Sequence, residues 1–143
     1  LMEVIARCAK LKVDIVTEDE REGDKRRILN FGHTIGHALE THFGFDTLRH
    51  GEAIAYGMIA AGKLSTEYQK LKIEDFELLK KTINKLPLPA LPEFNFSTVL
   101  QIMQNDKKVQ KGRLHFILIE DIGHAVVQHN IKEKSIINVL EDL

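Results

Sequence analysis

Five polar side chains recur at steps of four, three, four and three residues in one stretch of the chain. They are Arg26, Asn30, His33, His37 and Glu40. This alternation follows the turn of an α-helix, so a helix over about residues 25–43 would carry all five on one face and apolar residues on another. A face that only meets solvent usually carries Lys and Glu. Two imidazoles, an amide and a guanidinium indicate a binding or catalytic site instead.

Metal binding is the first chemistry that this spacing suggests. His33 and His37 lie one helical turn apart, which lets two imidazoles meet one ion, and Glu40 follows as a possible third ligand. His50, at the expected start of another helix, is a second candidate partner for His33 across the intervening loop. The spacing slightly favours the set His33, His37 and Glu40, and it leaves the alternative with His50 open.

Composition narrows the class of protein. The chain has 143 residues, 43% of them hydrophobic, and a net charge of −1, which is typical of one soluble globular domain. The mixed, near-neutral charge predicts no nucleic-acid partner. The single Cys8 excludes an internal disulfide and suits a reducing compartment, so the predicted location is the cytoplasm. The longest nearly uncharged run, residues 53–62, is too short to cross a bilayer, which predicts no membrane partner.

The hydrophobic pattern predicts a mainly α fold, a multi-helix domain with one small β-hairpin near the C-terminus. The helices are expected over residues 1–16, 25–43, 53–71, 73–86, 97–109 and 133–143. Ser97 is the expected cap of the fifth helix, and three prolines between 87 and 92 predict an extended connection before it. Apolar runs on either side of Gly123 predict the hairpin. Small residues in 53–71 would let a neighbouring backbone approach closely.

Two segments carry a resemblance to a known family. NFGHTIGHALE (residues 30–40) and RHGEAIAYGM (residues 49–58) closely resemble the 3-dehydroquinate synthase family, and the similarity extends over nearly the whole chain. The resemblance implies that residues 1–143 are the C-terminal helical domain, without the N-terminal NAD-binding domain and without the first part of the helical domain. The chain also lacks the glycine-rich phosphate-binding motifs GxGxxG and GxxxxGK[ST], so a nucleotide site would lie outside it.

The same resemblance implies a function for the intact protein. It would be a lyase that eliminates phosphate from a sugar phosphate and forms the carbocycle 3-dehydroquinate in the shikimate (aromatic amino-acid) pathway. The chain alone is expected to be inactive. The alternatives are a related sugar-phosphate cyclase, such as 2-deoxy-scyllo-inosose synthase, and a non-catalytic metal-binding helical module.

The resemblance also reassigns the metal ligands. It implies that His33 and His50 bind a zinc or cobalt ion, and that the third ligand is a glutamate in an earlier helix. Glu3 lies in a segment that imitates this helix, but its distance to the following motifs is too short. Glu40 and Glu52 are then expected to be structural or supporting residues.

Further residues match family positions that contact the substrate. His37 and Lys12 are the expected catalytic residues, with His37 as a proton shuttle near neutral pH. Arg26 and Asn30 are expected to bind substrate, because a guanidinium offers a bidentate fork for an oxyanion and an amide offers both a donor and an acceptor. Basic candidates for substrate phosphate are Lys107, Lys108 and Arg113. A homodimer is expected, through the face near residues 1–16 or through helix 53–71.

Overall fold

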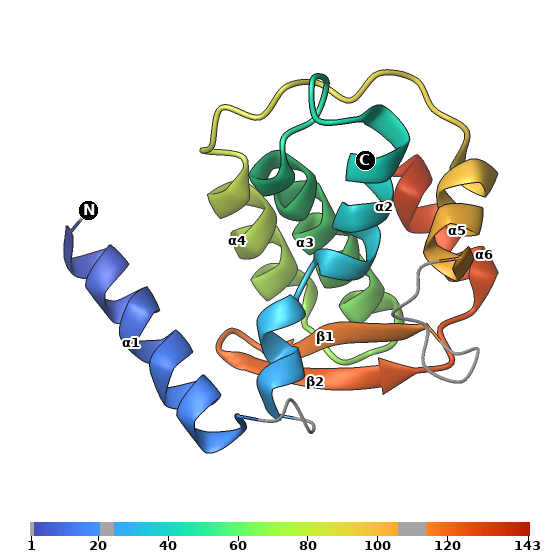
Figure 1. The fold of residues 1–143 in the computed structure, drawn as a ribbon. Coiled ribbons are helices and arrows are strands. Elements are labelled where there is room, and N and C mark those ends of the chain that lie inside the picture. The colour runs from blue at the N-terminus through green and yellow to red at the C-terminus, as the bar shows by residue number, and fades with distance from the viewer. Residues whose placement is uncertain (1, 21–24, 106–113) are drawn as a thin grey trace.

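The computed structural model describes residues 2–20, 25–105 and 114–143. The fold is mainly helical with an antiparallel hairpin near the C-terminus, as predicted (Figure 1). In chain order the elements are α1 (Met2–Glu18), the 3₁₀ helix η1 (Lys25–Asn30), α2 (His33–Phe43), α3 (His50–Glu67), α4 (Ile73–Ile83), α5 (Phe96–Asn105), β1 (His115–Asp121), β2 (His124–His129) and α6 (Glu133–Glu141). Within these three described ranges, no helix is both long and apolar enough to cross a membrane.

Helix α3 lies at the centre of the fold, where it packs against α2, α4, α6 and β1. Its small residues and those of α2 meet larger apolar side chains from α5, α6 and β1 in the main core. The largest fully buried side chains of that core include Ile35, Leu39, Leu64, Met103 and Phe116. A second, smaller cluster joins α3 to α4. The position of α3 therefore fixes where its first residue, His50, lies.

Three glycines let α2 and α3 cross at very short range. A Cβ atom at Gly57 would lie 2.0 Å from the carbonyl oxygen of Gly32 and 2.7 Å from the amide nitrogen of Gly36. On another side of α3, a Cβ at Gly62 would meet the side chains of α4. The predicted close approach to the small-residue helix is therefore confirmed. Because neighbouring helices of the same chain cover these residues, they are not available to a second copy.

The predicted continuous helix over residues 25–43 is wrong. The chain turns at residues 31–32, where Gly32 adopts φ 79°, in the left-handed region that favours glycine. This turn brings the Gly32 backbone against Gly57 and separates η1 from α2. Arg26 and Asn30 consequently lie on a different element from His33 and the residues that follow it.

The hairpin holds the start of α2 and the end of α3. His115 pairs with His129 and Ile117 with Val127 in the antiparallel register, which becomes irregular after Ile119. There the buried hydroxyl of Ser65 accepts the Ile119 N–H at 3.0 Å. At the other end of β1, Thr34 Oγ1 donates to the carbonyl oxygen of His115 at 2.9 Å. The hairpin thus braces both helices that carry the histidines.

The connection between α4 and α5 is extended, as the prolines predict. Tyr56 of α3 donates from its hydroxyl to the carbonyl oxygen of Pro89 at 2.6 Å, which ties this connection to the central helix. Burial raises the pKa of Tyr56, and the nearby charge of Glu52 adds to the shift. The predicted cap is wrong, because the side chain of Asn95, not that of Ser97, accepts the N–H of residue 98 at 3.1 Å.

Helix α1 stands apart from the other α-helices (Figure 1). None of its residues is buried, and it contacts η1. Five of its large apolar side chains are more than half exposed: Met2, Val4, Ile5, Leu11 and Val13. An amphipathic helix of this kind usually packs against another surface, so α1 offers an apolar face for association.

Candidate functional site

Three imidazoles meet where α2 and α3 cross. His33 is the first residue of α2, His37 lies one turn later, and His50 is the first residue of α3. The ring centroids are 5.4 Å apart for His33 and His37, 5.9 Å for His33 and His50, and 5.3 Å for His37 and His50. Two imidazoles bound to one tetrahedral ion at about 2 Å would place their centroids roughly 5 Å apart. The two pairs that include His37 match this separation, and the His33–His50 pair is about 1 Å wider.

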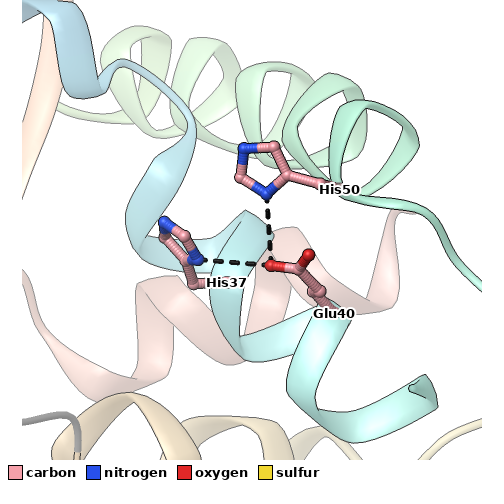
Figure 2. Close-up of side chains that lie close together, drawn as sticks. All are labelled: His37, Glu40 and His50. Carbon is pink, nitrogen blue, oxygen red and sulfur yellow. Dashed lines mark hydrogen bonds and ion pairs between the residues drawn. The ribbon is translucent and has the colours of Figure 1, made fainter. Parts of the chain in front are cut away.

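A nearly buried carboxylate lies between two of the rings. The side chain of Glu40 is 9% exposed, and its Oε2 accepts a hydrogen bond from His50 Nδ1 at 3.2 Å (Figure 2). The same oxygen lies 3.3 Å from His37 Nδ1, an ion-pair contact whenever that ring is protonated. Burying a carboxylate is costly unless donors surround it. Its two imidazole neighbours offset this cost.

The oxygen atoms next to the rings of His50 and His33 indicate which ring nitrogens carry protons. A carboxylate oxygen and a backbone carbonyl can only accept, so the hydrogen bond from His50 assigns its proton to Nδ1. His33 Nδ1 lies 3.2 Å from the carbonyl oxygen of Phe31, so this contact places a proton on Nδ1 of that ring as well. A neutral imidazole protonated at Nδ1 has its lone pair on Nε2, the atom that can bind a metal. His33 and His50 thus each have Nδ1 beside an acceptor, an arrangement usual for imidazoles that bind a metal through Nε2.

The geometry also allows a different set of ligands. Within the described ranges, ligand atoms of His37, Glu40 and His50 all lie within 4.8 Å of one another. Separations of 3.2 and 3.3 Å match the edge of a tetrahedral site with bonds of about 2 Å. This group differs from the set that helical spacing favours, because it contains His50 in place of His33. In either arrangement, imidazole and carboxylate donors suit a divalent ion such as zinc or cobalt.

The other predicted site residues lie on the preceding elements. Lys12 is exposed on α1. Arg26 and Asn30 belong to η1, and the guanidinium of Arg26 donates to the carbonyl oxygen of Glu20 at 3.3 Å. The structure therefore brings the three histidines together at the crossing of α2 and α3, whereas Lys12 and Arg26 belong to α1 and η1. Lys107, Lys108 and Arg113 lie outside the described residues.

Two residues near the cluster have roles that the sequence only partly indicated. Glu52 accepts the backbone N–H of Arg49 at 2.8 Å, so it stabilises the start of α3, in line with a structural role. Glu40 is more central than the family resemblance implied. The available signal was its spacing of three residues from His37, which places both on one helical face.

Solved structures place this fold in a class. The arrangement matches part of the fold of sugar-phosphate cyclases. A 2-deoxy-scyllo-inosose synthase, solved in complex with carbaglucose-6-phosphate, NAD+ and Co2+, superposes with a TM-score of 0.84 at 27% identity, over 96% of this chain and 39% of that chain. A 2-epi-5-epi-valiolone synthase from Streptomyces hygroscopicus, with NAD+ and Zn2+ bound, shares the fold at 22% identity and a TM-score of 0.85, over 99% and 39% of the two chains.

The chain belongs to the 3-dehydroquinate synthase C-terminal family, whose model matches residues 1–109. The 3-dehydroquinate synthase of Crocosphaera subtropica is 39% identical over 145 residues, which cover 100% of this chain and 40% of that protein. The enzyme of Psychrobacter cryohalolentis is 38% identical over 141 residues, which cover 98% of this chain and 38% of its own length. The chain thus spans about two fifths of the length of these relatives.

Proposed function

We propose that residues 1–143 are the metal- and substrate-binding domain of a 3-dehydroquinate synthase. The observation that carries the proposal is the cluster of three imidazoles at the crossing of α2 and α3, with acceptors on Nδ1 of His33 and His50. Relatives that match the whole chain and are about two and a half times as long support its assignment to one domain of a larger enzyme. The NAD-binding part would then belong to the remaining length.

The metal ion would be held by Nε2 of His33 and of His50, with a further ligand from outside residues 1–143. The donor set fits, because each of these rings has its Nδ1 beside an acceptor, as is usual for imidazoles that bind a metal through Nε2. A bound zinc or cobalt ion would supply Lewis acidity toward a substrate hydroxyl. The protein's contribution is to fix the two rings on separate helices whose crossing distance is set by glycine.

The intact enzyme would convert a phosphorylated seven-carbon keto-acid sugar into 3-dehydroquinate and release phosphate in the aromatic amino-acid pathway. NAD would be reduced and reoxidised within one cycle. His37 would accept or return a proton at Nε2, and the Glu40 carboxylate beside Nδ1, which favours the proton on that side, supports this role. It lies beside both proposed metal ligands, where the reacting carbons would be held.

Substrate charge would be met by basic and amide groups that lie before and after the cluster in the chain. Arg26 would bind an oxyanion in place of its present carbonyl partner, and Asn30 would bind hydroxyl or carboxylate oxygens. Lys12 would act beside them as a catalytic cation. Lys107 and Lys108 are proposed for the phosphate. Holding both ends of a flexible sugar phosphate favours one conformer and limits side reactions.

A related sugar-phosphate cyclase is the second candidate, and the similarity of fold to 2-deoxy-scyllo-inosose synthase favours it. The difference lies in the substrate carboxylate. In the longer enzyme, Arg26→Lys should raise KM for a carboxylate-bearing sugar phosphate about tenfold or more, because a bidentate contact is lost. A cyclase that uses substrates without a carboxylate would be insensitive to this change. A non-catalytic metal-binding module would show neither activity.

The metal assignment is tested by titrating zinc or cobalt into the 143-residue chain. We expect weak binding that His33→Ala and His50→Ala each abolish. His124→Ala is the matched control, since this exposed histidine lies on β2 away from the cluster. Retained binding in His33→Ala, with loss in Glu40→Gln, would instead establish the set of His37, Glu40 and His50.

Activity is tested separately. The 143-residue chain supplied with NAD, zinc and the sugar phosphate should release no phosphate above the blank, because hydride transfer requires a positioned dinucleotide. Turnover well above the blank would contradict the assignment to one domain of a larger enzyme. We also propose a cytoplasmic location, and association as a homodimer through α1, whose apolar side chains are the more exposed of the two predicted surfaces.

A further inference from the structure

Glu40 combines three properties that a purely structural helix residue does not need. It is one of two buried polar or charged residues in the described ranges, the other being Ser65. It lies on α2 beside the core residue Leu39, a position where an apolar side chain would avoid the cost of burying charge. Its carboxylate faces two imidazoles from different helices (Figure 2).

We propose that Glu40 is a positioning residue that orients the imidazoles of His50 and His37 together through a single carboxylate oxygen. By accepting from His50 Nδ1 it fixes the tautomer and the plane of a metal ligand. The same oxygen lies 3.3 Å from His37 Nδ1 and favours the proton on that nitrogen. Nε2 of His37 is then directed away from the carboxylate. The roles of the two histidines rest on the function proposed above; the orientation itself does not.

The shared oxygen is what couples the two rings. His37 and His50 lie 5.3 Å apart with their planes at 45°, so they do not stack on each other. Their relative orientation is instead held from one side by Oε2, from a side chain that solvent scarcely reaches. The carboxylate is nearly buried, whereas the side chains of His37 and His50 are 32% and 53% exposed, so water reaches the rings but scarcely the oxygen that holds them. A hydrogen bond to an ionised carboxylate is stronger than one between neutral groups. Moving the carboxylate would therefore release both rings.

His33 provides an internal contrast. Its Nδ1 is oriented by the Phe31 carbonyl oxygen, a backbone acceptor that no change at Glu40 removes. The proposal therefore predicts that loss of the carboxylate alters the tautomers of His37 and His50 and leaves that of His33 unchanged. A general loosening of α2 would affect His33 as well.

The test is nitrogen-15 NMR of the imidazoles in the metal-free 143-residue chain at about pH 8, where unperturbed histidines are neutral. Three variants are compared with the wild type: Glu40→Leu, which removes the acceptor at similar size, Glu40→Gln, which keeps one acceptor oxygen, and the cap variant Glu52→Gln. We expect Nδ1–H at all three rings in the wild type and in Glu52→Gln. Glu40→Leu should lose this preference at His50 and His37 only, and Glu40→Gln should largely retain it.

Cobalt binding gives a second readout. Glu40→Leu should weaken Co2+ binding on the order of 10- to 100-fold, Glu40→Gln less, and neither should move the visible cobalt absorption bands. Unchanged tautomers in Glu40→Leu would overturn the proposal. A proton on Nε2 of His50 in the wild type would also overturn it, and this measurement does not require Glu40→Leu to fold. Shifted cobalt bands in Glu40→Gln would overturn it in favour of Glu40 as a direct ligand. If His33→Ala leaves metal binding intact, the proposed metal site fails, whatever the tautomers show.

Discussion

Replacing Gly57 with alanine tests whether the crossing of α2 and α3 sets both stability and the histidine cluster. The added carbon would lie 2.0 Å from the carbonyl oxygen of Gly32, whereas Cβ contacts essentially never fall below 3.0 Å, so the backbones must separate by about 1 Å. The neighbouring atoms are backbone, which no rotamer change can move aside. Overpacking of this kind costs about 1–3 kcal/mol, and backbone obstruction belongs at the upper end.

The higher helical preference of alanine over glycine offsets roughly 0.5–1 kcal/mol of this destabilisation. We therefore expect a net loss of about 2 kcal/mol in the free energy of unfolding for Gly57→Ala. At roughly 2–4 °C per kcal/mol for a chain of this size, the midpoint of thermal unfolding should fall by about 4–8 °C. Because His50 lies on the displaced helix, Co2+ binding should weaken in the same variant.

Gly51→Ala is the matched control, since it makes the same change in the same helix with nothing within 4 Å of the new carbon. Because Gly51 lies in the first turn of α3, the change should leave the free energy of unfolding equal or raise it by less than about 1 kcal/mol. Both variants are measured by urea denaturation with a common slope, and by thermal unfolding. A Gly57→Ala protein as stable as Gly51→Ala would refute the reasoning that this contact fixes the two helices.

Three further outcomes are expected. Ser65→Ala should lower the free energy of unfolding in urea by about 1–3 kcal/mol, because the buried N–H of Ile119 loses its acceptor; a change below about 0.3 kcal/mol would contradict this. The hydrogen bond from Lys70, and secondly the charge of Lys70, lower the pKa of Glu120 from its usual 4.5. The pair therefore stabilises the fold above pH 4.5, and this contribution is lost as the pH falls through the lowered pKa. In an NMR titration, Lys70→Met should bring the Glu120 pKa back up, and an unchanged value would exclude the pair as the cause. Sedimentation over a concentration series should detect dimers that Leu11→Glu weakens, whereas a monomer at every concentration would rule out association through α1.

Much of the architecture was predictable from local pattern. Apolar residues at helical spacing indicated the helices, and β-branched runs around Gly123 indicated the hairpin, because these periods reflect how each segment meets the core. Proline placed the extended connection, since it restricts its own backbone and that of the residue before it. The motif around His33 and His37 pointed to the family to which the chain belongs.

The break at Gly32 could not be predicted from the spacing of residues 26–40. It depends on Gly57, which lies 25 positions later and approaches only when α3 folds back across α2. Periodicity within one segment carries no information about that approach, so the pattern predicted a single helix that would have placed Arg26 and His33 on one face. The tertiary contact separates them instead.

The sequence by itself determined which residues could bind a metal, through the types and spacing of His33, His37, Glu40 and His50. Only the tertiary structure decided how they meet. Neighbouring helices bury Glu40, and a buried carboxylate is costly unless N–H donors lie next to it. These donors are His50 on α3 and His37 on its own helix. Helical spacing fixes neighbours one turn apart, whereas a partner on another helix depends on how closely the two backbones pack.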